Sequence, residues 1–152
     1  MKKVLIKNAF AYSLAGLVFS LAVMAFSPIR GLDSYEIYLN EKLIMKQYVN
    51  QALNLRVLQL EKAQAQDQLS IRYTHCTFKG PGSSRTLTLK DSEGHILKQW
   101  SFANSSDENN VMKISVAEVL QLEKEHKDHR ISLIYKSQEL PGAEMLAFLK
   151  LE

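Results

Sequence analysis

The sequence is poor in cysteine and lacks the short motifs that mark common catalytic sites. Cys76 is the only cysteine in the 152 residues, so a disulfide within the chain is excluded and an apolar core must hold the fold together. No serine lies in the Gly-x-Ser-x-Gly pattern of a hydrolase, and the glycine-rich stretch 80–84 is not followed by the Gly-Lys-Ser/Thr of a phosphate-binding loop. The sequence therefore favours a non-catalytic protein and indicates no cofactor and no metal.

An excess of positive charge is also missing once the N-terminal segment is set aside. The chain has 19 Lys and Arg against 16 Asp and Glu, but residues 1–25 contain Lys2, Lys3 and Lys7 and no acidic residue. The rest is balanced at 16 basic and 16 acidic residues. Because a neutral domain without a Lys/Arg stripe has little attraction for a phosphate backbone, we expect no nucleic-acid partner.

A long hydrophobic run is present at the N-terminus. Residues 9–26 carry no charge and follow the three lysines, which is the layout of a secretory signal. Val23-Met24-Ala25 can serve as a cleavage motif, but an uncharged run of 18 residues also reaches the length of a membrane-spanning helix. Residues 1–25 are therefore predicted to be a signal peptide or an N-terminal membrane anchor, built on residues 9–26.

Export follows from either alternative. The lysines keep the N-terminal end of the apolar run in the cytoplasm, so the rest of the chain lies on the other side of the membrane. We expect a periplasmic or extracellular protein, anchored in the inner membrane if the segment is retained. Residues 26–33 read as a linker and residues 34–152 as a single β domain.

Alternation of apolar and polar residues predicts a mostly β domain. The predicted strands span residues 34–39, 43–49, 52–60, 69–76, 85–90, 95–102, 130–137 and 145–151. About eight short antiparallel strands at this spacing are typical of a β-sandwich or an open barrel. A capping box formed by Ser115 and Glu118 predicts one short helix near residues 116–125.

The clearest predicted hairpin joins residues 85–90 to residues 95–102. Its turn is Asp91-Ser92-Glu93-Gly94, with glycine at the last position, as type I turns prefer. The second strand carries Trp100, the single tryptophan. We expect this hairpin at the centre of the fold, with Trp100 buried on one face together with Ile96 and Phe102.

Two sets of candidate metal ligands carry little specificity. His75 and Cys76 are neighbours on a predicted strand, so their side chains point to opposite faces and a structural role is favoured for both. His126 and His129 lie in a charged tract, which we expect to face solvent.

Among the aromatic residues, Tyr38 stands out. Most tyrosines alternate in register with aliphatic residues and are expected to pack in the core. Tyr38 falls on the opposite side from Tyr35 and Ile37, which makes it a candidate ligand contact. Trp100 is the second candidate, should it lie on the surface instead of in the core.

Two functions are consistent with these patterns. The first is a non-catalytic exported domain that has a protein-interaction or scaffolding role in the bacterial envelope, with another envelope protein as partner and membrane contact only through an uncleaved N-terminal segment. The alternative is a small-ligand or glycan-binding module that uses exposed loops and an aromatic face. A concave aromatic pocket would favour the module, and an exposed strand edge or apolar patch would favour the scaffold.

Overall fold

The structure is a computed structural model that describes residues 32–50, 52–76, 80–106, 110–126 and 130–150. The predicted signal or anchor, residues 1–25, lies outside these ranges, as does most of the predicted linker. No helix within the described ranges is long and apolar enough to cross a bilayer.

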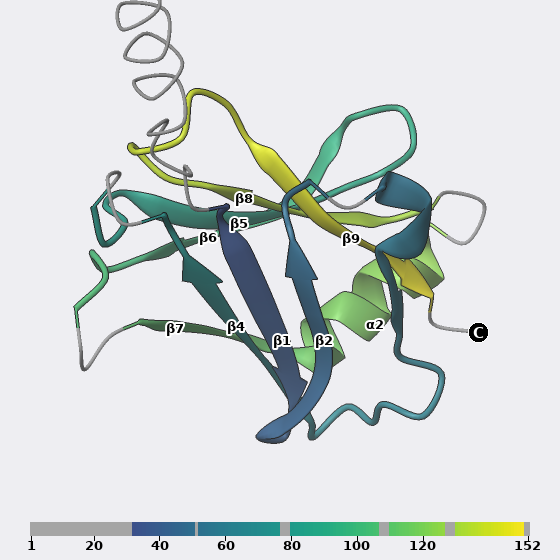
Figure 1. Ribbon diagram of the computed structural model, residues 1–152. Helices are drawn as coiled ribbons and strands as arrows, with labels where there is room; N and C mark the ends of the chain where they lie inside the picture. Colours follow the sequence, from purple (N-terminus) through teal and green to yellow (C-terminus); the bar gives the residue numbers. More distant parts are fainter. Residues whose placement is uncertain (1–31, 51, 77–79, 107–109, 127–129, 151–152) are drawn as a thin grey trace, which may run out of the picture. The chain divides into compact units, whose positions relative to one another are not determined.

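Nine strands within the described residues form two sheets that face each other (Figure 1). The four-stranded sheet has the order β2-β1-β4-β7, and the five-stranded sheet has the order β3-β9-β8-β5-β6. The strands are β1 (Ser34–Leu39), β2 (Lys42–Tyr48), β3 (Val57–Gln59), β4 (Gln68–Thr74), β5 (Arg85–Lys90), β6 (Ile96–Phe102), β7 (Val111–Ser115), β8 (Ser132–Lys136) and β9 (Glu144–Lys150). The predicted mostly β fold is confirmed, and the sheets are arranged as a sandwich instead of closing into a barrel.

The core lies between the two sheets because alternate residues of each inner strand point toward the other layer. Tyr35 and Ile37 of β1 and Leu87 and Leu89 of β5 belong to one cluster of buried hydrophobic residues. All four side chains are fully buried. The alternation read from the sequence therefore assigns the inner face of these strands correctly.

One strand pair departs from the predicted antiparallel arrangement. β3 runs parallel to β9, with Val57 opposite Phe148. A 3-10 turn, η1 (Leu53–Leu55), precedes β3, so the single strand predicted over residues 52–60 is wrong. In its place the chain makes a turn followed by three residues of edge strand.

The strand β7 is missing from the sequence-based prediction. It pairs with β4 and runs directly into the predicted helix, α2 (Val116–Glu125). Ser115 caps this helix, since its side chain accepts a hydrogen bond from the Ala117 N–H at 3.2 Å. Ser115 is thus both the last residue of β7 and the cap of the helix, and the capping pattern alone predicts only the helix.

The β5–β6 hairpin is confirmed, but its predicted place in the fold is wrong. The Gly94 N–H donates to the Asp91 carbonyl, and Gly94 has φ +90°, which glycine adopts readily. β5 is an inner strand, whereas β6 pairs with β5 alone and forms the edge of its sheet. Ile96 is accordingly 59% exposed and Trp100 is half-buried, because an edge strand has core on fewer sides.

Candidate functional site

A groove of about 610 Å³ lies on the outer face of the four-stranded sheet. Strands β1, β4 and β7 and the turn after β1 build it, and its lining is mostly polar. The lining residues are Tyr38, Asn40, Glu41, Gln68, Ser70, Arg72, Val111 and Lys113. Side chains alternate between the two faces of a strand. The lining residues of β1, β4 and β7 therefore point outward, because the residues between them in each strand face the core.

Tyr38 lies in this groove with its orientation fixed by charged neighbours. Its hydroxyl donates to Glu36 Oε2 at 2.6 Å, and the Arg72 guanidinium lies 5.8 Å from the centre of its ring. The hydrogen bond to Glu36 raises the pKa of Tyr38, so the phenol stays neutral and keeps donating. The predicted outward position of Tyr38 agrees with this structure, while a ligand contact there stays a prediction.

Glu36 organises the charges around Tyr38. It is bonded to Lys46 at 2.8 Å and lies 3.6 Å from Arg72 Nη1. The hydrogen bond from Lys46, followed by the one from Tyr38, lowers the pKa of the Glu36 carboxyl. Glu36 therefore remains a carboxylate that holds Tyr38 and Arg72 side by side.

Trp100, the second candidate ligand contact, lies on the other sheet. Its indole Nε1 donates to Glu118 of α2 at 3.0 Å, and Lys98 Nζ lies 3.3 Å from the same carboxylate. Trp100 packs against the core cluster but is only half-buried, because it lies on an edge strand, so the predicted full burial of its ring is not met. The structure does not bring Tyr38 and Trp100 into one site.

A second surface feature surrounds the edge strand β2. Six large hydrophobic side chains are exposed among the described residues, and five of them lie on or next to β2. Leu43 and Tyr48 belong to β2, and Leu53 and Leu55 belong to η1, which follows it in the chain. Leu32 precedes Asp33, whose backbone carbonyl accepts a hydrogen bond from the Val49 N–H at the end of β2. We call these five residues the β2 edge set.

A buried polar network connects the sheets at one end of the sandwich. Asp33, assigned to the linker from the sequence, accepts a hydrogen bond from the Cys76 backbone N–H at 2.9 Å and from the Tyr73 hydroxyl at 3.1 Å. His75 Nδ1 lies 3.6 Å from Asp33 Oδ2, and His75 Nε2 lies 3.1 Å from the Tyr135 hydroxyl. Burial, reinforced by the Asp33 charge, raises the pKa of Tyr73.

His75 therefore has a structural environment, as the sequence favoured. Ser137 Oγ lies 3.3 Å from its Nε2, so aspartate, histidine and serine lie in the order of a catalytic triad. The ring is covered, however: a Cβ placed on Gly82 would lie 3.1 Å from the same Nε2. Ser137 itself is buried. With nucleophile and base both covered, this network joins the two sheets and does not present a reactive serine.

The network continues into the loop after β8. Glu139 accepts hydrogen bonds from the Ser83 N–H at 2.9 Å and from the Ser83 hydroxyl at 2.7 Å. Desolvation raises the pKa of Glu139, but these hydrogen bonds outweigh it and lower the pKa to about 2. These hydrogen bonds link the loop before β5, which contains Ser83, to the loop after β8, which contains Glu139.

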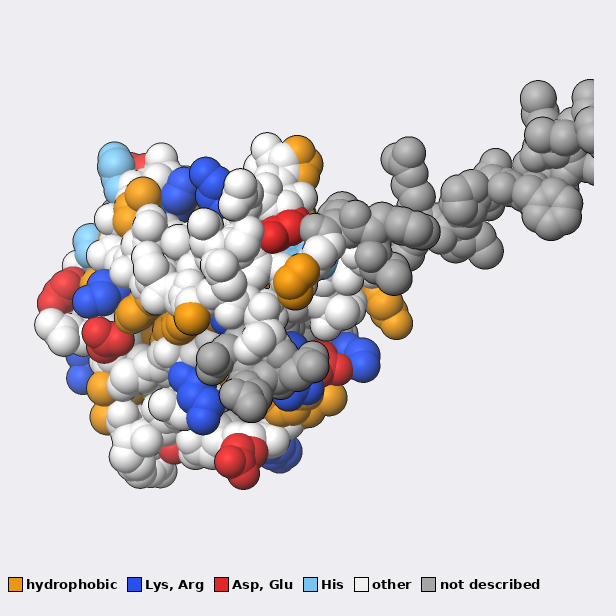
Figure 2. Space-filling model, turned by 90° about the vertical axis from the view of Figure 1, so that its left-hand side faces the viewer, with side chains coloured by type: hydrophobic (Ala, Val, Ile, Leu, Met, Phe, Trp, Pro, Cys, Tyr) orange, Lys and Arg blue, Asp and Glu red, His pale blue; other side chains and the backbone are white. Residues whose placement is uncertain are grey.

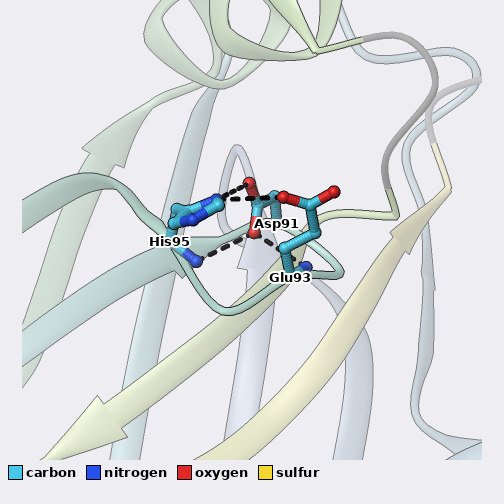
Figure 3. A group of neighbouring side chains, drawn as sticks. All are labelled: Asp91, Glu93 and His95. Atoms are coloured by element: carbon cyan, nitrogen blue, oxygen red, sulfur yellow. Dashed lines mark hydrogen bonds and ion pairs between the residues drawn. The ribbon is translucent and has the colours of Figure 1, made fainter.

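Asp91, Glu93 and His95 come together in the β5–β6 turn (Figure 3). Their candidate ligand atoms lie within 4.8 Å of one another, and they form the one such group of metal-ligating side chains in the described ranges. Asp91 Oδ1 already accepts the N–H groups of Glu93 and His95, each at 2.9 Å, and Oδ2 lies 3.0 Å from His95 Nδ1. Turn formation alone accounts for this cluster. His129, of the other predicted pair, lies outside the described residues.

Acidic and basic side chains are interspersed on the face drawn in Figure 2, as the neutral charge balance predicts. Comparison with known protein families, with curated proteins and with solved structures finds no match.

Proposed function

We propose that this protein is an exported, non-catalytic domain that binds another envelope protein through the β2 edge. The observation that carries the proposal is that five of the six exposed large hydrophobic side chains of the described residues belong to the β2 edge set. Exposed apolar side chains favour an interaction site, because burying them against a partner removes them from water.

The position of the set on an edge strand gives the mode of binding. Among the described strands β2 pairs only with β1, so one side of its backbone offers hydrogen-bonding groups to an added strand. Leu43 and Tyr48 are exposed near the two ends of the strand. An extended segment of the partner would add to the sheet and cover these side chains at the same time.

Export remains part of the proposal and is supported by the basic and apolar pattern of residues 1–26. Cell fractionation tests it directly. Recovery of the protein from the periplasm, the medium or the inner membrane supports export, and a soluble cytosolic protein contradicts it.

Co-isolation after chemical crosslinking in cells tests the β2 edge. A Leu53→Asp/Leu55→Asp variant places charge in the edge set at positions that are 52% and 59% exposed, so folding is left intact. We expect this variant to lose the partner that the wild-type chain retains. The matched control is Ile96→Asp, at 59% exposure on the other sheet, which should retain the partner. Equal recovery with all three chains would contradict the proposal.

Ligand binding is a second candidate function, and the groove around Tyr38 favours it. A concave surface with an aromatic ring and a few oriented polar groups is the usual form of a small-molecule site. Leu43 of the β2 edge set lies opposite Tyr38, so the groove and the β2 edge adjoin. Leu53 and Leu55 do not line the groove, so substitutions at these two leucines and at Arg72 test the two functions separately.

A further inference from the structure

The groove around Tyr38 has a chemical composition that selects among ligands. Its lining contains two cationic side chains, Arg72 and Lys113, and one carboxylate, Glu41. The groove therefore has a surplus of positive charge, which favours a ligand with an acidic group.

Arg72 presents a guanidinium that the protein engages only in part. Its side chain is 41% exposed, and its Nη1 lies 3.6 Å from Glu36 Oε2, which is a long ion pair. A ligand carboxylate is the natural acceptor, because the guanidinium fork matches it in two parallel hydrogen bonds.

The remaining lining groups favour a ligand that has hydroxyl groups and an apolar ring face. Glu41 can only accept hydrogen bonds when ionised, and the Gln68 amide and Ser70 hydroxyl both donate and accept. A purely anionic ligand would be repelled by Glu41, whereas a ligand with hydroxyl groups can donate to it. Tyr38 supplies an apolar surface on which the C–H face of a sugar ring can pack.

We infer that the groove binds an acidic saccharide, an oligosaccharide whose sugar units carry carboxylates. Arg72 receives a carboxylate, Tyr38 packs against the sugar ring, and Glu41, Gln68 and Ser70 bind its hydroxyls. Lys113, exposed on the edge strand β7, contributes charge to a neighbouring unit. This inference rests on the ligand-binding candidate above and is independent of the β2 edge.

Calorimetric titration of the full chain in mild detergent with hexagalacturonate tests the inference. We expect binding that weakens with added salt, and affinity at least about tenfold higher than for the neutral hexasaccharide maltohexaose. A hexaglutamate peptide of similar charge should bind at least about tenfold more weakly, since it has no sugar ring.

Variants of the lining residues locate the site. Arg72→Gln and Tyr38→Ala should each weaken hexagalacturonate binding by about tenfold or more, whereas Tyr38→Phe, which keeps the ring, should stay within about threefold. The charge control is Lys136→Gln, at an exposed lysine on β8 of the other sheet, and it should bind as the wild type does. Circular dichroism confirms that each variant is folded.

Four results would overturn all or part of the inference. Absence of hexagalacturonate binding is the first, and hexaglutamate binding as tight as hexagalacturonate is the second, because it would assign the groove to an acidic peptide. The third is equal weakening by Arg72→Gln and Lys136→Gln, which would mean diffuse charge attraction. Binding of maltohexaose that Tyr38→Ala abolishes would overturn the acidic specificity while leaving the ligand-binding function intact.

Discussion

The strands β2 and β6 are both seven residues long and both form edges, one in each sheet, but their apolar side chains have different surroundings. On β6, Trp100 is bonded to α2 through Glu118, so the chain covers part of its own edge. On β2, Leu43 and Tyr48 are exposed, and the exposed Leu53 and Leu55 follow in the chain. An edge strand that a helix of the same chain covers has less apolar surface left to bury. An edge strand whose apolar side chains are exposed can bury them by binding a partner.

The largest effect is expected at Arg56, which ties the end of β2 to the opposite sheet. This buried side chain donates to the carbonyl oxygen of Val49, to Glu144 at 2.6 Å and to the carbonyl of Met145 at 2.5 Å. Arg56→Ala should lower the free energy of unfolding by about 3–5 kcal/mol, because it removes a buried ion pair and several hydrogen bonds. Urea denaturation measures the change. A loss below about 1 kcal/mol would show that this end of β2 holds without the arginine.

Trp100→Ala should have a smaller effect, since the ring is half-buried on an edge. We expect a loss of about 1–3 kcal/mol in urea denaturation, below the range for a tryptophan in a closed core. Trp100→Phe keeps most of the packing and should lose about 1 kcal/mol, the contribution of the hydrogen bond to Glu118. A loss above about 4 kcal/mol for Trp100→Ala would place the ring in the core and remove the contrast with β2.

The largest contribution to acid sensitivity is expected from Glu139, at the polar end of the sandwich. The folded pKa of Glu139 is about 2, below its ordinary value of 4.5, so its stabilising effect is complete above pH 4.5 and is lost as the pH falls toward 2. Glu139→Gln should make the free energy of unfolding depend less on pH in that window. Chemical denaturation at a series of pH values measures this. An unchanged pH dependence would contradict the assigned role of the Ser83 hydrogen bonds.

The smallest effect on stability is expected in the β2 edge set itself. Leu53→Ser should change the free energy of unfolding by less than about 0.5 kcal/mol, as surface substitutions usually do, and Ile96→Ser should behave in the same way. A thermal-melting comparison of the two variants checks this. A large loss for Leu53→Ser alone would mean that this leucine stabilises the fold, and the edge would then need no partner to explain it.

Period-two alternation predicts most of the inner strands because each of them buries one face. β1 and β5 have the bounds read from the sequence, and Tyr35, Ile37, Leu87 and Leu89 are buried as expected. Alternation says nothing about the order of strands in a sheet, however. The hairpin of β5 and β6 was therefore predicted as a unit, and its position at an edge was not.

The segment 52–60 shows why local pattern fails elsewhere. Leu53 and Leu55 look like core residues but are exposed, whereas Arg56, Leu58 and Leu60 are buried. Burial of Arg56 depends on acceptors in Glu144 and Met145, far along the chain, and no local pattern reveals them. Exposed leucines next to a buried arginine are a signal that only the tertiary structure provides.

The candidate sites were predictable to different degrees. The outward position of Tyr38 follows from alternation in β1 alone. Its neighbours in the groove, such as Arg72 and Lys113, come from β4 and β7, and the sequence pattern predicts no strand at β7. The network of Asp33, His75 and Tyr135 likewise joins residues that are distant in sequence, so it required the sheet pairing to be known.

Site-specific photo-crosslinking in cells tests the β2 edge most directly. A photoreactive amino acid replaces Leu43 in one chain and Ile96 in a control chain, at positions that are 46% and 59% exposed on the two edge strands. The account predicts a discrete adduct with another envelope protein from position 43, lost in the Leu53→Asp/Leu55→Asp background, and none from position 96. Adducts of equal yield from both positions, or from position 96 alone, would contradict the assignment of β2 as the docking edge.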